Sequence, residues 1–313
     1  MNTKLTLSVS PHIHSGRSTS RIMLDVVIAL LPAAAAGCII FGLRALAVLA
    51  VTVVSCVAFE ALFNLITKRE QTVGDCSAMV TGLLLGMNLP ANIPLWQCVV
   101  GGFFAIVVVK CLFGGLGCNP VNPAITARVF MLVAFGTMAK AAFPADYTGS
   151  TLDAVSSATP LAAETAPSLT DLFLGLHGGA IGETCAAALL VGLLYLLCRR
   201  VITVHIPVAF VGTVFVCSFF MEGMDPVAAL AAILSGGLFI GAFFMATDYV
   251  TSPSTAWGKV IFGVGAGLIT FLIRYFGVYP EGVSFAILLM NILTPYVDSW
   301  TQHKIFGVGG KQA

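Results

Sequence analysis

Long apolar runs dominate this sequence and constrain its fold more than any other feature. A run of roughly 20 apolar residues can cross the hydrocarbon core of a bilayer as a helix. Only helices and closed barrels satisfy their backbone polar groups in lipid, and these runs lack the period-2 alternation of barrel strands. We therefore predict an all-α integral membrane protein with about ten transmembrane helices. The predicted spans are 22–42, 45–66, 76–89, 94–113, 123–139, 180–198, 204–221, 227–247, 258–276 and 282–299.

The composition supports the same class of protein. Charged residues make up 9% of the chain and hydrophobic residues 58%, whereas about a quarter of the residues of a soluble domain are charged. A soluble domain is therefore excluded, and we expect the lipid bilayer as a partner and no nucleic acid. The polar N-terminal stretch shows no evident signal-peptide cleavage site, so the first apolar run is expected to remain in the mature protein.

The distribution of Lys and Arg predicts the orientation. Ten crossings place both termini on one side, together with most of the Lys and Arg residues, whereas the other side carries Arg44, Lys140 and Arg274. The positive-inside rule then predicts cytoplasmic termini. The predicted organisation is a cytoplasmic N-terminal segment (1–21), a first five-helix membrane repeat (22–139), an outer-face loop (140–179), a second five-helix repeat (180–299) and a cytoplasmic C-terminal tail (300–313).

The membrane region contains two pairs of similar segments. "LFGGLGCNPVNPAI" (112–125) resembles "YFGVYPEGVSFAIL" (275–288), and "GMNLPANIPLW" (86–96) resembles "ATDYVTSPSTAW" (246–257). Each pair is offset by five helices, an odd number, so the two halves would form an inverted repeat, and the Gly- and Pro-broken segments in matching positions would indicate the binding site. The alternative is that short turns between membrane helices generally contain Gly, Pro and Asn.

Charged residues inside or at the ends of apolar spans are the next candidates. Charge is unfavourable there unless it is paired or faces a cavity. Asp25, Arg128 and Asp248 are the least able to reach water, so we expect them to contact a cofactor, an ion path or each other. A structural ion pair or an interface anchor is an equally good interpretation for each. The other residues of this kind are Glu60, Lys110, Glu183 and Arg274.

Other motifs give weaker indications. The nine cysteines include no Cys-x-x-Cys pair, so no metal site is expected. "GVGAG" at 263–267 lies in an apolar helix, and its small residues predict close helix packing instead of a dinucleotide site.

The long polar loop contains "DAVSSATPL" at 153–161. By itself, a Ser- and Thr-rich stretch predicts only a solvated loop. It also resembles the flavin-attachment signature Asp-x-x-(Ser/Thr)-x-Ala-Thr, in which FMN is esterified through its phosphate to the final Thr. That resemblance implies a covalent FMN on Thr159. The other matching positions are Asp153, Ser156, Ser157 and Ala158, and Ser157 stands where Gly is common in the signature.

Long blocks of the chain resemble one family in order. The blocks are "SPHIHSGRSTSRIMLDVVIALLPA", "CSAMVTGLLLGMNLP", "KCLFGGLGCNPVNPA", "GLHGGAIGETCAAALLVGLLYL", "HIPVAF", "GAFFMATDYVTSP" and "IFGVGAGLITFLIRYFGVYPEGVSFAILLMNILTPYVD". They are similar to the RnfD subunit of the Rnf electron-transport complex. The NqrB-type subunit of the sodium-translocating NADH:quinone reductase is similar in the same segments, but it generally has a longer N-terminal extension.

This resemblance implies a flavoprotein subunit in a bacterial or archaeal cytoplasmic (inner) membrane. It would relay electrons within an ion-translocating ferredoxin:NAD oxidoreductase and couple their flow to sodium or proton transport. Its partners would be the other membrane and peripheral subunits and, during maturation, a flavin transferase. The related quinone-reductase family implies a second, non-covalent riboflavin. The candidates for that flavin or for an ion path are Asn88, Asn119, Asn122, Arg128, Asp248, Thr251 and Ser252.

Two other functions remain open at this point. A stand-alone permease or channel without a redox cofactor would also use an inverted repeat and intramembrane polar residues. An assembly protein without a cofactor would anchor redox partners through its helices. A covalently attached flavin would distinguish the electron-relay function from both.

Overall fold

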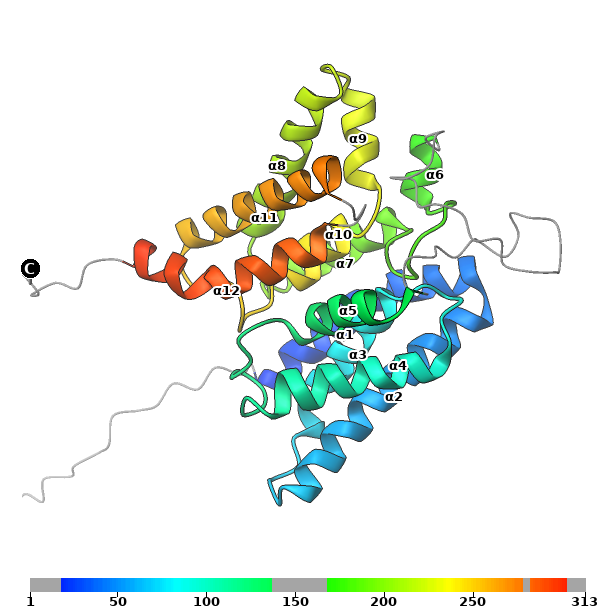
Figure 1. Ribbon diagram of the computed structural model, residues 1–313, viewed down its shortest axis with the longest axis vertical. Coiled ribbons are helices and arrows are strands. Elements are labelled where there is room, and N and C mark those ends of the chain that lie inside the picture. The colour runs from blue at the N-terminus through cyan, green and yellow to red at the C-terminus, as the bar shows by residue number, and fades with distance from the viewer. Residues whose placement is uncertain (1–17, 137–167, 278–281, 303–313) are drawn as a thin grey trace, which may run out of the picture.

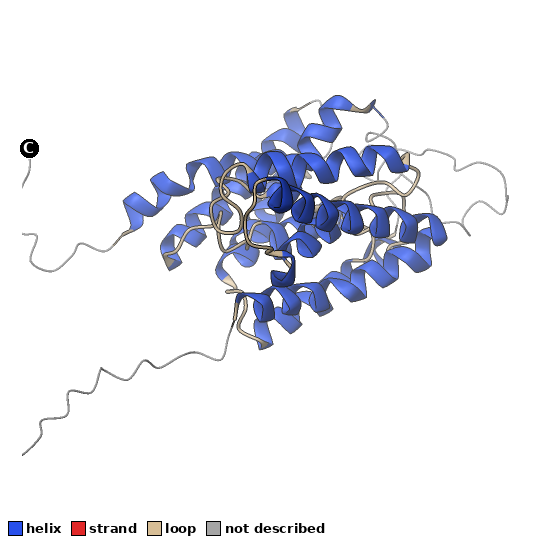
Figure 2. Ribbon diagram, turned by 90° about the horizontal axis from the view of Figure 1, so that it is seen from below, coloured by secondary structure: helices blue, strands red, loops and turns tan. Residues whose placement is uncertain are grey.

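The computed structural model describes residues 18–136, 168–277 and 282–302, and within these ranges it contains helices and no β-strand. Figure 1 shows the chain from the N-terminal to the C-terminal helices, and Figure 2 shows the same helices from below. The all-α prediction is therefore confirmed for the described residues.

The helices fall into two groups along the chain. The first comprises α1 (Thr19–Phe41), α2 (Leu43–Ile66), the 3₁₀ turn η1 (Val73–Asp75), α3 (Ser77–Met87), α4 (Leu95–Phe103), the π-helix η2 (Phe104–Cys111) and α5 (Pro123–Ala134). The second comprises α6 (Leu169–Leu174), α7 (Ala186–Cys198), α8 (His205–Met221), α9 (Pro226–Leu234), α10 (Leu238–Ile240), the π-helix η4 (Gly241–Met245), α11 (Ala256–Phe276) and α12 (Val283–Thr301).

Every predicted span contains a helix, but the helices differ in length. Within the described residues, α1, α2, α11 and α12 are each long and apolar enough to cross a bilayer. The other apolar helices are 10–17 residues long, except for the bent pair of α9 with α10 and η4. The protein is thus a multi-pass membrane protein, and ten crossings stay a prediction.

The expectation of one continuous helix over 227–247 is wrong. The chain bends by 67° between α9 and the helix that starts at Leu238. Gly236 adopts a positive φ of 69° at the break, a conformation that glycine takes without strain. Arg274 on α11 donates hydrogen bonds to the carbonyl oxygens of Ala232 (2.7 Å) and Ser235 (3.1 Å), which replace bonds that the helix would have made.

Two other predicted boundaries also need correction. The sixth span was expected to begin at 180, but α7 begins at Ala186. The preceding backbone is held elsewhere, because the amides of Ile181 and Gly182 donate to the carbonyls of Leu89 and Met87. The fifth predicted span reached 139, but α5 ends at Ala134. The short helix α6 lies inside the predicted outer loop, which was not expected to contain a helix.

The two groups of helices pack in a similar way. In the first, α2 packs against α3 and α4; in the second, α8 packs against α9 and α11. The groups meet where α1 contacts α7 and α5 contacts α12, near the middle of Figure 1. A Cβ on Gly267 would lie 3.0 Å from the Phe210 carbonyl oxygen, so this part of "GVGAG" lets α11 approach α8 closely, as expected.

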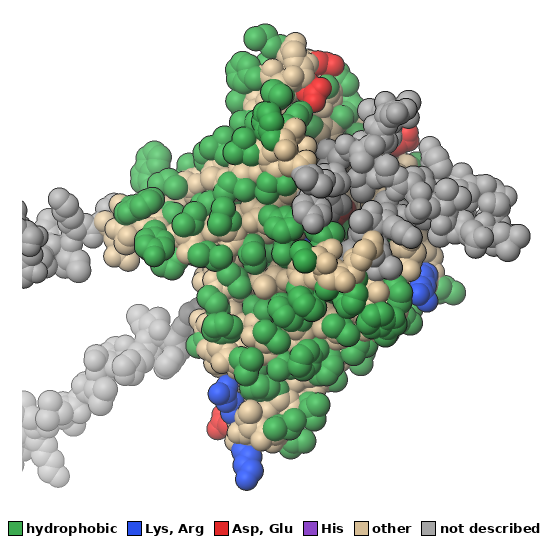
Figure 3. Space-filling view, in the orientation of Figure 1, with side chains coloured by type: hydrophobic (Ala, Val, Ile, Leu, Met, Phe, Trp, Pro, Cys, Tyr) green, Lys and Arg blue, Asp and Glu red, His purple; other side chains and the backbone are tan. Residues whose placement is uncertain are grey.

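The surface suits a lipid environment. Figure 3 shows a face covered largely by hydrophobic side chains, with the visible charged residues at its margins. Large apolar side chains point outward, including Ile39 (82% exposed) and Leu43 (84% exposed). Exposed apolar surface on this scale would destabilise a water-soluble monomer.

Candidate functional site

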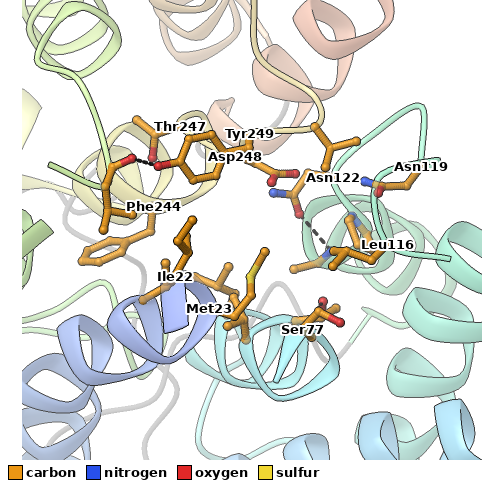
Figure 4. A pocket seen from close by; sticks show the side chains of 18 of the residues that line it. Ile22, Met23, Ser77, Leu116, Asn119, Asn122, Phe244, Thr247, Asp248 and Tyr249 are labelled. Atoms are coloured by element: carbon orange, nitrogen blue, oxygen red, sulfur yellow. Dashed lines mark hydrogen bonds between the residues drawn. The ribbon is translucent and has the colours of Figure 1, made fainter. Parts of the chain in front are cut away.

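A pocket lies where the two broken segments of the chain meet. Its wall combines the turn that precedes α5 with the turn that follows η4, and α1 and α3 close the other side. In Figure 4, Asp248, Asn119 and Asn122 lie on one side, and Ile22 and Met23 lie opposite. The pocket offers about 80 Å³ to the centres of water-sized molecules. That volume holds several waters or a hydrated cation.

Asn122 connects the two halves at this pocket. It is the N-cap of α5, because its Oδ1 accepts hydrogen bonds from the amides of Ala124 (3.0 Å) and Ile125 (3.3 Å). Pro123 follows at the first helical position, where its missing N–H costs nothing. The Nδ2 of Asn122 donates to the carbonyl oxygen of Met245, the last residue of η4, at 3.2 Å. Asn119 braces the same turn by donating to the Val121 carbonyl at 3.0 Å.

Asp248 is the acidic group of the pocket. Its carboxylate accepts a hydrogen bond from Thr251 Oγ1 at 3.2 Å, and within the described residues it has no basic partner. Burial raises the pKa of Asp248 above its ordinary value, because a less polar environment disfavours the charged form. The Ser252 amide closes the turn on the Asp248 carbonyl at 3.1 Å, and neither Thr251 nor Ser252 lines the pocket.

Arg128 and Asn88 belong to a separate buried cluster. Arg128 forms an ion pair with Glu183 at 2.6 Å and donates to Asn88 Oδ1 at 2.6 Å. The Asn88 amide in turn lies 3.5 Å from the sulfur of Met245. The predicted residues are thus divided between two polar clusters on either side of Met245.

Asp25 is also paired. Arg199 lies 3.3 Å from its carboxylate, and the Tyr195 hydroxyl donates to it at 3.0 Å. Asp25 and Arg128 therefore show the structural ion pairs that were one of the two sequence interpretations, and they do not contact each other or Asp248.

The sequence analysis did not pair Glu60 with Lys110. Lys110 Nζ lies 2.7 Å from Glu60 Oε1 and 2.6 Å from Ser77 Oγ, and both charged side chains are buried. Lys110 and Ser77 also line the pocket. The available sign was that both charges fall near the same predicted end of neighbouring spans, where an ion pair is the least unfavourable arrangement.

The flavin-attachment prediction falls elsewhere. Asp153, Ser156, Ser157, Ala158 and Thr159 lie outside the described residues. The geometry therefore bears on the membrane pocket and not on the loop.

Comparison with known proteins follows the same blocks of sequence. The family described as NQR2, RnfD, RnfE matches residues 6–307. The chain is 48% identical to the D subunit of the Na(+)-translocating ferredoxin:NAD(+) oxidoreductase complex of Acetobacterium woodii, over 97% of this chain and 96% of that protein.

Two further relatives are similar over comparable lengths. The D subunit of the proton-translocating ferredoxin:NAD(+) oxidoreductase complex of Clostridium ljungdahlii is 41% identical, over 96% of each chain. The D subunit of the ion-translocating oxidoreductase complex of Cronobacter sakazakii is 36% identical, over 96% of this chain and 98% of that protein. The chain therefore belongs to the NQR2, RnfD, RnfE family.

Proposed function

We propose that this chain is the RnfD component of an ion-translocating ferredoxin:NAD(+) oxidoreductase complex of the Rnf type. The observation that carries this proposal is the match to proteins of that name along nearly the whole chain. Its partners are the other membrane and peripheral subunits, since the sequence has no recognisable motif for NAD. The stand-alone permease has no comparable support from the relatives.

The redox group in this proposal is FMN esterified to Thr159. Thr159 contributes the hydroxyl oxygen of the phosphodiester, and Asp153 and Ser156 are recognition residues for a flavin transferase. When bound, FMN supplies one-electron transfer, and the chain supplies its position. The support is the sequence motif, which ends with Ala158 and Thr159 in a polar loop.

The topology completes the proposal. We place ten crossings in the cytoplasmic membrane, with cytoplasmic termini and the loop 140–179 on the outer face. Support for an inverted repeat comes from the matched packing of α2 and α8 with their neighbours. The two broken segments that line the pocket lie at the predicted positions of a transport site.

The pocket would serve the transported ion. The relatives from A. woodii and C. ljungdahlii are named for Na(+) and protons respectively, so family membership alone does not select the ion. Asp248 suits either ion, because a carboxylate binds Na⁺ when ionised and carries a proton when neutral. A non-covalent riboflavin also stays a prediction: the pocket places amide and hydroxyl groups beside apolar walls, a combination common in sites for ring-shaped ligands.

The deciding experiment is the mass of the peptide that contains Asp153 to Thr159. The protein is purified from its native membrane, because a host without the flavin transferase would give a false negative. We expect an added mass of one FMN less one water, and fragmentation should locate it on Thr159. Thr159→Ala should abolish the adduct and electron transfer while the complex still assembles. Ser156→Ala and Ser157→Ala control for the neighbouring hydroxyls.

An unmodified peptide from flavin-competent cells would contradict the redox role. The membrane fold would be unaffected, and the permease and assembly functions would then lead. Electron transfer that survives in Thr159→Ala would have the same meaning.

A further inference from the structure

An apolar groove runs along the surface of α8 and α11, away from the pocket. Its walls include Val208 and Val216 on α8 and Val260 and Val264 on α11, and its volume is about 630 Å³. The floor is open at Gly212, where an added Cβ would meet nothing within 4 Å. Val208 is 64% exposed and Val216 is 51% exposed, so this is a surface groove.

One end of the groove is basic. The helices run in the same direction, because a Cβ on Gly263 would lie 3.0 Å from the Ile206 carbonyl and one on Gly267 would lie 3.0 Å from the Phe210 carbonyl. Lys259 is one turn before Gly263, so it lies at the same end as His205, the first residue of α8. Within the described chain, neither side chain has an acidic partner.

Aromatic side chains mark this end as the edge of the bilayer. Trp257 is 74% exposed and Tyr249 is 55% exposed. The Tyr249 hydroxyl donates to the Val201 carbonyl, which fixes it close to the start of α8. Exposed Trp and Tyr of membrane proteins gather at the level of the lipid headgroups. Lys259 and His205 therefore lie where a phosphate group would be.

We propose that this groove binds one acyl chain of an anionic phospholipid, with the headgroup phosphate held by Lys259 and His205. The groove extends from His205 to Val216, which at the rise of an α-helix is about 17 Å. Half of the hydrocarbon core is about 15 Å thick, so the groove matches a chain of one leaflet. The positive charge at one end selects an anionic lipid.

The first half of the molecule supplies a matched control. A second surface groove lies between α2 and α4, where Val54, Ala58 and Val99 are among its walls, and no basic residue lines it. It offers a similar apolar surface without the charge. If apolar contact alone held lipid, the two grooves would show the same headgroup preference.

The test uses the whole complex in nanodiscs that contain equal amounts of dioleoyl phosphatidylglycerol and dioleoyl phosphatidylcholine. A photoreactive benzoylphenylalanine replaces Val216, far from the basic end, or Val54 in the control groove, and mass spectrometry identifies the adducts. At 216 we expect phosphatidylglycerol adducts to exceed phosphatidylcholine adducts by about fivefold. Lys259→Gln with His205→Gln should bring the ratio close to one, and Gly212→Leu should reduce both adducts. At 54 the ratio should be near one.

Equal labelling of the two lipids at 216 would overturn the proposal, as would a preference that survives in the double variant. An adduct with another polypeptide in place of lipid would also overturn it and would assign the groove to a partner's transmembrane helix.

Discussion

The two halves of the molecule solve the same electrostatic problem in different ways. Lys110 ends η2 in the first half, and Arg274 lies near the end of α11 in the second, each one or two residues before the similar segments 112–125 and 275–288. Lys110 is neutralised by a buried carboxylate, Glu60, at 2.7 Å. Arg274 instead donates to two backbone carbonyls at the end of α9.

This difference accounts for the straightness of one half and the bend of the other. A helix end carries partial negative charge on its free carbonyls, which stabilises a nearby cation. Arg274 therefore stabilises the broken helix that the first half does not have. A carboxylate partner leaves the neighbouring helix intact, so α3 continues without a break from Ser77 to Met87.

Removing one member of the buried pair should have the largest effect. Lys110→Met leaves Glu60 charged and buried, so we expect the free energy of unfolding to fall by about 3–5 kcal/mol. Unfolding in mixed detergent and SDS micelles measures this. Glu60→Leu in the same chain should recover most of the loss, and a double variant as unstable as the single one would show that the pair is not the cause.

Arg274→Met should have a smaller effect. It leaves two carbonyl oxygens without this donor but creates no buried charge, so we expect a loss of about 2–3 kcal/mol by the same unfolding measurement. Arg274→Lys should recover only part of it, because an ammonium group lacks the planar fork that reaches both carbonyls. A loss as large as that of Lys110→Met would contradict the proposed difference between the halves.

Close helix packing should be equally sensitive in both halves. A Cβ on Gly82 would lie 2.7 Å from the Val53 Cα, and one on Gly267 would lie 2.7 Å from the Thr213 Cβ. We expect Gly82→Ala and Gly267→Ala each to lower the free energy of unfolding by about 1–2 kcal/mol. Gly212→Ala is the control, since its Cβ meets open space. A destabilised control would show that packing is not what the measurement reports.

The smallest effect on stability is expected at Asp248, which matches Asn88 in the similar segments 246–257 and 86–96. Because burial raises its pKa, folding favours the protonated form. Wild type and Asp248→Asn should have equal stability below the ordinary carboxyl value near pH 4. As the pH rises through the raised pKa, wild type should lose stability relative to the variant. Unfolding measured across this range tests the sign, and a relative gain by wild type would contradict it.

Sequence patterns predicted the helices better than their breaks. Each apolar range contains a helix because lipid leaves the backbone no other arrangement. The bend at Ser235 was missed, although Ser235-Gly236-Gly237 is the kind of sequence at which helices kink, because the surrounding apolar residues obscure it. The π-helical turn that starts at Phe104 has no sequence sign that we recognise.

The candidate site was predictable in part for similar reasons. Asn119, Asn122 and Asp248 were selected as polar residues of broken segments, and the structure brings them to one pocket. Glu60 and Lys110 were not paired, because 50 residues separate them and only the packing of α2 against η2 joins them. Thr159 depends on the motif alone.

The hydrogen bond from Asn122 to Met245 has a mechanical consequence. It joins the first residue of one half's helix to the last turn of the other half's broken span, directly beside the pocket. At 3.2 Å it has little room to stretch, since such bonds are lost by about 3.5 Å. The halves can therefore separate here by only a few tenths of an ångström, roughly, before the amide must release its acceptor. Asn122 thus acts as a latch, and widening the pocket along this line and unfastening the two halves are a single event.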